Sequence, residues 1–183
     1  MSRRAELIRV GCFASCIAIL AGCASGRIET VPGVPEALRV SGNEVVSLEL
    51  HGVGVQIYEC QATQDGQTRF TWILKAPAAD LLDHTGNTVG RHYAGPTWEA
   101  NDGSKVIGEI VARDDGPDAG AIPWLLLRAT SSTGKGLFSK TQFIQRLHTV
   151  GGKAPATDCD ASQAGKRIRV AYAADYYFYR ARK

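Results

Sequence analysis

From Glu44 onward, short apolar runs rich in Val, Ile, Thr and aromatic residues alternate with Gly, Asn, Asp and Pro. This spacing is typical of all-β domains, and no long stretch has the period of an amphipathic helix. In Phe70-Thr71-Trp72 every second residue is apolar, which indicates a strand with one buried face. We expect about nine strands, over residues 44–50, 53–61, 68–76, 88–93, 105–113, 124–131, 140–150, 168–172 and 176–180.

The predicted fold is a single all-β domain, because 183 residues are too few for two domains once a leader and a tether are set aside. A β-sandwich and a closed β-barrel fit this strand pattern equally well, so both stay open. Turn residues mark hairpins at 83–87 and 101–104. Gly52-Val53-Gly54 is interpreted as a turn between two strands, because Ile57 replaces the third glycine of a dinucleotide-binding fingerprint.

The N-terminus has the features of a secretory leader. Three arginines precede an apolar run from Val10 to Leu20, and small residues and Cys23 follow. Leu20-Ala21-Gly22-Cys23 resembles the lipobox of bacterial lipoproteins, in which the chain is cut before the cysteine and lipid is attached to its thiol. An ordinary signal-peptidase site is the alternative, but such a site needs no cysteine after the cut.

The lipobox resemblance divides the chain into a signal peptide (1–22), a lipidated N-terminus with a tether (23–37) and a β domain (38–183). Multiple acyl chains on Cys23 would make a stable membrane anchor. Ala24 follows Cys23, where an aspartate is the familiar signal for retention at the inner membrane. We therefore expect a protein of the cell envelope, attached to the outer membrane of a Gram-negative bacterium, with no transmembrane helix after processing.

Charge gives no reason to expect a nucleic-acid partner. The formal net charge of the chain is +3, and the leader contains three arginines and one glutamate, so its removal leaves +1. A nearly neutral domain without a basic cluster lacks the electrostatic footprint of a nucleic-acid-binding protein.

Two cysteines, Cys60 and Cys159, remain when the leader is removed and Cys23 is lipidated. In an oxidising compartment we expect them to form a disulfide. A zinc pair and a reactive thiol are the alternatives, but neither cysteine has a second cysteine or a histidine at ligand spacing.

The stretch from His92 to Ser104 contains the densest set of chemically capable residues. In a functional interpretation His92, Trp98 and Asp102 bind a ligand, with Trp98 as an apolar platform, or His92 and Asp102 act as acid and base. In a structural interpretation Trp98 belongs to the core and Asp102 to a turn. We favour the structural interpretation, because each residue also has a plain role in a hairpin.

The four histidines and Arg146 give weaker indications of a functional site. His51, His84, His92 and His148 show no clustering along the chain, so we expect no metal site, and no signature predicts a cofactor. Arg146 lies inside a strand and is a candidate for an internal ion pair or for an anion contact; the ion pair is the commoner use.

Several segments together resemble the family catalogued as domain of unknown function 3455. They are residues 55–60, 70–72, 92–104, 122–126, 136–139, 144–146, 149–152, 159–160 and 175–179. The resemblance spans nearly all of residues 38–180 and implies a secreted or surface-attached domain of bacteria and fungi, with no established activity and no assigned catalytic residues.

The function expected from these features is that of a lipid-anchored envelope protein. We expect its β domain to be non-enzymatic and to bind an unidentified small molecule, glycan or protein of the envelope. A small extracytoplasmic enzyme acting on envelope polymers and a purely structural domain are the alternatives.

Overall fold

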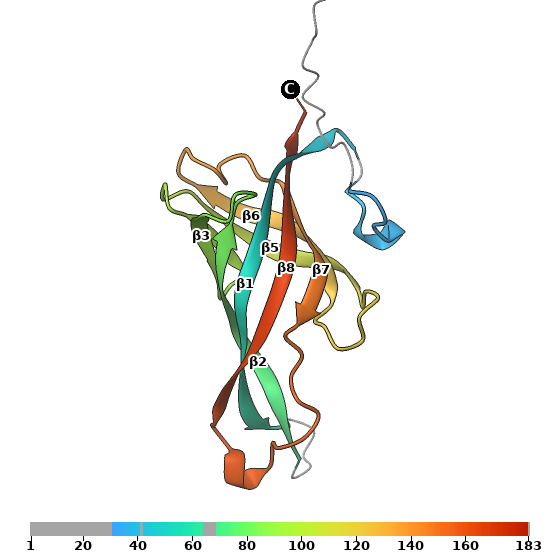
Figure 1. The fold of residues 1–183 in the computed structure, drawn as a ribbon, viewed down its shortest axis with the longest axis vertical. Helices are drawn as coiled ribbons and strands as arrows, with labels where there is room; N and C mark the ends of the chain where they lie inside the picture. The colour runs from blue at the N-terminus through green and yellow to red at the C-terminus, as the bar shows by residue number, and fades with distance from the viewer. Residues whose placement is uncertain (1–30, 41, 64–68, 183) are drawn as a thin grey trace, which may run out of the picture.

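Eight antiparallel strands form one sheet that closes into a barrel in the computed structural model, which describes residues 31–40, 42–63 and 69–182 (Figure 1). Each strand pairs with the next in the chain, and β8 pairs with β1 to close the ring. The strands are β1 (Glu44–Ala62), β2 (Phe70–Leu82), β3 (Thr88–Tyr93), β4 (Thr97–Ala100), β5 (Lys105–Asp114), β6 (Trp124–Thr133), β7 (Phe143–Gly151) and β8 (Arg167–Ala181). The all-β prediction is confirmed, and of the two arrangements left open the barrel is the one that forms.

Continuous strands replace two predicted interruptions. β1 runs without a break through Gly52-Val53-Gly54, so the turn predicted there was wrong. A Cβ atom at Gly52 would lie 2.6 Å from the ring of Tyr176 on β8, and one at Gly54 would collide with the backbone of β2. The two glycines therefore serve close approach between neighbouring strands. β8 likewise joins the two strands predicted over 168–172 and 176–180.

β4 was not predicted as a strand because it has only four residues. It follows a turn at Gly95-Pro96, in which Gly95 has φ 99°, a left-handed conformation that glycine adopts at no steric cost. The turn places β4 between β3 and β5, with Trp98 opposite His92. One missed strand and two merged pairs together explain why eight strands form where about nine were expected.

The main core lies inside the barrel. Along β8 the residues Tyr172, Ala174, Tyr176 and Phe178 belong to this interior cluster, as the two-residue period of a strand requires. Phe138, from the loop between β6 and β7, is fully buried in the same cluster. Its backbone N–H donates a hydrogen bond to Ser104 Oγ over 3.1 Å. The loop therefore fills one end of the barrel.

The N-terminal segment 31–40 packs on the outside of the barrel (Figure 1). It includes the 3-10 helix η1 (Glu36–Leu38). Val34 and Leu38 are buried against Trp124 and Tyr179, and Gln145 Nε2 donates a hydrogen bond to the Leu38 carbonyl over 2.6 Å. Packing thus includes the last residues of the predicted tether, whereas the folded part was expected to begin near Leu38. No helix within the described ranges is long and apolar enough to cross a membrane.

β1, β2 and β8 extend beyond the ring as a narrow stem, at the bottom of Figure 1. A small core there contains Tyr58, Cys60 and Trp72. Cys60 forms the predicted disulfide with Cys159, with their Cα atoms 5.5 Å apart. The bridge fastens the loop between β7 and β8, which carries the 3-10 helix η2 (Ala161–Gln163), to the stem.

Candidate functional site

A cavity of about 510 Å³ lies in the barrel interior on the side of the stem. Small-molecule sites in proteins have volumes of about 300 to 1,000 Å³, so the cavity has the size of a ligand site. Its apolar wall is formed by Leu74, Pro77, Ile110, Ile122, Leu125 and Leu127. The turn Ala94-Gly95-Pro96, at which β3 ends and after which β4 begins, also lines the cavity.

His92 and Trp98 lie together in this cavity wall. Their rings are stacked with centroids 4.4 Å apart and planes 13° apart. His92 Nδ1 lies 2.9 Å from the Thr97 carbonyl oxygen and donates to it, since a carbonyl can only accept. Burial lowers the pKa of His92 to about 3, so the ring is neutral at neutral pH. With the proton on Nδ1, the other ring nitrogen is an acceptor.

Gln56 and Trp98 present unpaired polar atoms. Each side chain lines the cavity and is 1% exposed. Neither amide atom of Gln56 finds a hydrogen-bond partner in the described protein, nor does Trp98 Nε1. A buried polar group without a partner costs about 1–3 kcal/mol, and native proteins pair nearly all such groups. The cavity wall thus includes two side chains whose hydrogen-bonding atoms the described residues leave unpaired.

Arg146 also faces the cavity, from β7. Its Nε and Nη2 atoms donate to the Pro123 carbonyl over 3.1 and 2.8 Å. No carboxylate among residues 31–40, 42–63 and 69–182 forms an ion pair with it. The commoner of the two interpretations of Arg146, an internal ion pair, was wrong. Burial lowers the pKa of Arg146, but a guanidinium stays charged in proteins.

The hydroxyls of Tyr58, Tyr172 and Tyr176 interact with the charged end of Arg146. The Tyr172 and Tyr176 hydroxyl oxygens lie 3.2 Å apart, and the Tyr58 hydroxyl donates to the Gly152 carbonyl over 2.6 Å. Burial raises the pKa of all three tyrosines, so the hydroxyls keep their protons. These neutral hydroxyls lie beside the Arg146 guanidinium, which is one of the cations of the cavity lining.

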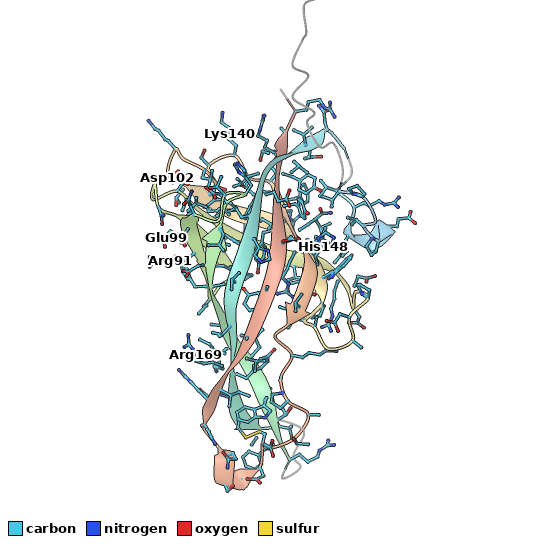
Figure 2. All side chains as sticks on the ribbon, viewed as in Figure 1. Arg91, Glu99, Asp102, Lys140, His148 and Arg169 are labelled. Atoms are coloured by element: carbon cyan, nitrogen blue, oxygen red, sulfur yellow. A yellow bond between two sulfur atoms is a disulfide. The ribbon has the colours of Figure 1, made fainter. Side chains whose placement is uncertain are left out.

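Asp102 lies elsewhere, in the turn between β4 and β5, at the end of the barrel away from the stem (Figure 2). Its two carboxylate oxygens accept hydrogen bonds from the backbone N–H groups of Ser104 and Leu137, each over 2.8 Å. Hydrogen bonds from the Ser104 side chain and then from these N–H groups lower the pKa of Asp102. Asp102 holds the loop that carries Phe138. It forms no acid–base pair with His92.

Two of the four histidines meet on the outer face of the barrel. His51 and His148 hydrogen-bond the two carboxylate oxygens of Asp175, over 2.8 and 2.9 Å (Figure 2 labels His148). The part of the chain that the structure describes contains no group of three or more His, Cys, Asp or Glu side chains arranged to hold a metal ion.

Sequence reasoning identified His92 and Trp98 but missed Gln56 and the tyrosines. Gln56 lies an even number of residues from Leu50 and Tyr58, so it occupies the apolar side of a strand. A polar residue on that side was the signal available. Cys23 lies outside the described residues, so its predicted lipidation stays a prediction.

The fold and the cavity together define an eight-stranded antiparallel barrel with a ligand-sized interior, a class of architecture that holds one small molecule in other proteins. The chain belongs to the family described as "Protein of unknown function (DUF3455)", whose model matches residues 40–180. The resemblance seen in the sequence is thereby confirmed. Comparisons with curated proteins and with solved structures give no match.

Proposed function

We propose that the barrel binds a small molecule with an apolar body and a hydrogen-bonding group. The carrying observation is the Gln56 amide, which is buried, unpaired and part of the cavity wall. An amide offers both a donor and an acceptor, so it recognises a polar group on a ligand whose remaining surface contacts Leu125 and Leu127.

We favour binding over catalysis because His92 and Asp102, the predicted acid and base, do not form a pair. His92 is neutral because of its burial, and Asp102 is occupied in a turn at the other end of the barrel. General acid–base catalysis requires a titrating group within hydrogen-bond reach of the reacting proton. A purely structural domain is the other alternative to a binding domain, and a dye-binding experiment separates the two.

The neutral dye N-phenyl-1-naphthylamine is expected to bind saturably, with one dye per protein and a rise in fluorescence. The experiment uses residues 23–183 with the substitution Cys23→Ser. This chain carries no lipid and keeps every described residue. Ile110 lines the cavity and is largely exposed, whereas its neighbour Val111 is exposed but does not line it. Ile110→Trp should therefore weaken dye binding about tenfold by obstructing the entrance.

Val111→Trp is the matched control, and it should bind the dye like the parent protein. Circular dichroism verifies that both variants are folded. Absence of saturable binding to the parent protein, or equal weakening by both substitutions, would contradict the proposed cavity and favour a structural domain.

We further propose that lipid on Cys23 anchors the chain in the cell envelope. The support is the sequence Leu20-Ala21-Gly22-Cys23 after an apolar run. In cells, Cys23→Ser should leave an unprocessed chain without lipid, whereas Cys16→Ser, inside the leader, should be processed normally. Intact-mass measurement of the membrane fraction checks both, and normal processing of the Cys23→Ser chain would exclude the anchor.

A further inference from the structure

The charges that line the cavity are all positive. Its ionisable residues, apart from the neutral His92 and the tyrosines, are Lys75, Arg113, Arg146 and Lys153. Neither Asp nor Glu occurs among the lining residues of the described protein. A wall with one sign of charge beside apolar surface concentrates ligands of the opposite sign.

Arg146 is the least exposed of these four cations, and it has no acidic partner among the described residues. Arg113 pairs with Asp115 over 3.1 Å, and both side chains are exposed. Lys153 Nζ donates to the Ala119 carbonyl over 2.6 Å. Arg146 is partly buried and interacts with the Tyr172 and Tyr176 hydroxyls, and a charge withdrawn from water without a counter-charge is unfavourable.

The orientation of Arg146 is fixed before any ligand binds. Two of its N–H groups converge on the Pro123 carbonyl oxygen. A guanidinium has five N–H donors in a planar fork, so donors remain for a further acceptor. Holding the fork in place lowers the entropy lost when an anion binds, which favours a planar group that accepts two parallel hydrogen bonds.

We infer that the ligand is an amphipathic anion, an organic carboxylate whose charged group contacts Arg146 and whose apolar body lies against Leu125 and Leu127. This inference rests on the proposed binding function and adds the class of ligand. A partly buried cation without an acidic partner among the described residues matches one negative charge on the ligand. Gln56 and Trp98, whose Nε2 and Nε1 donors find no partner among the described residues, line the same cavity.

Displacement of N-phenyl-1-naphthylamine by decanoate, 1-decanol and decylammonium tests the inference, since the three competitors share one chain length and differ in charge. On the Cys23→Ser protein, decanoate should compete about tenfold more strongly than decanol. Decylammonium should be the weakest of the three. High salt should leave this order unchanged, because the deciding charge lies inside the cavity.

Arg146→Gln should remove the preference for decanoate over decanol while decanol still competes. Arg128→Gln is the matched control, because Arg128 is an exposed arginine paired with Glu109 and does not line the cavity. It removes the same charge and should keep the preference. If Arg146→Gln does not fold, the order of the three competitors on the parent protein decides whether the cavity prefers an anion.

The two proposals fail in different ways. Dye binding with equal competition by decanoate and decanol would overturn the anionic ligand and leave the binding cavity in place. A decanoate preference that disappears in high salt, or that survives Arg146→Gln, would overturn the assignment to Arg146. Absence of saturable dye binding would overturn the proposed function itself.

Discussion

Replacing Cys60 and Cys159 by serine is expected to lower the free energy of unfolding by about 2–5 kcal/mol. The bridge joins residues 99 positions apart, so its removal returns a large amount of freedom to the unfolded chain. Cys60 is also fully buried beside Trp72 in the small core of the stem. The effect is large because this core has few other residues to hold the loop between β7 and β8.

Urea unfolding of the double variant and of the parent protein, with and without dithiothreitol, measures this effect. Dithiothreitol should destabilise the parent protein to about the level of the variant and leave the variant unchanged. Limited proteolysis should cut the variant first in residues 152–166, whose link to the stem is lost. Equal unfolding midpoints for the oxidised parent and the variant would show that the bridge contributes no stability.

Acidification is expected to destabilise the folded protein through His92. Burial lowers the pKa of His92 from 6.5 to about 3, so below pH 6.5 the unfolded chain binds a proton that the folded chain does not. The stabilising contribution of the neutral ring is complete above pH 6.5 and is lost as the pH falls towards 3. Linkage gives a loss of about 2 kcal/mol between pH 7 and pH 5, and about 4–5 kcal/mol near pH 3.

His92→Phe isolates this contribution, because phenylalanine keeps a ring against Trp98 and does not titrate. The variant loses the hydrogen bond to the Thr97 carbonyl and should be less stable than the parent protein at pH 7. By pH 5 the difference should shrink or reverse. Urea unfolding at both pH values measures it, with the exposed His84 replaced by asparagine as the control. An identical pH dependence for the parent and His92→Phe would contradict a buried neutral histidine.

Much of the strand pattern could be predicted from local sequence. β3 begins and ends at the predicted residues, because alternating side chains between turn residues define a strand locally. Gly52 and Gly54 misled the prediction. Their role depends on Tyr176 of β8 and on the backbone of β2, which lie far away in the sequence.

The candidate site was predicted only in part. His92 and Trp98 lie six residues apart in a stretch interpreted as a hairpin, so their proximity followed from local sequence. Asp102 was included because it is also close in sequence, but a further turn directs it to the other end of the barrel. Gln56 and Arg146 come from distant strands, and nothing local shows that both face one cavity.

The sequence by itself determined the β class, the family and the two cysteines available for a bridge, because these depend on residue type, local alternation and cysteine count. The tertiary structure decided between barrel and sandwich, since the closing pairs of β1 with β8 join opposite ends of the domain. It also decided which polar side chains face inward. Strand register sets that direction, and a shift of one residue would turn Gln56 and Arg146 to the outside.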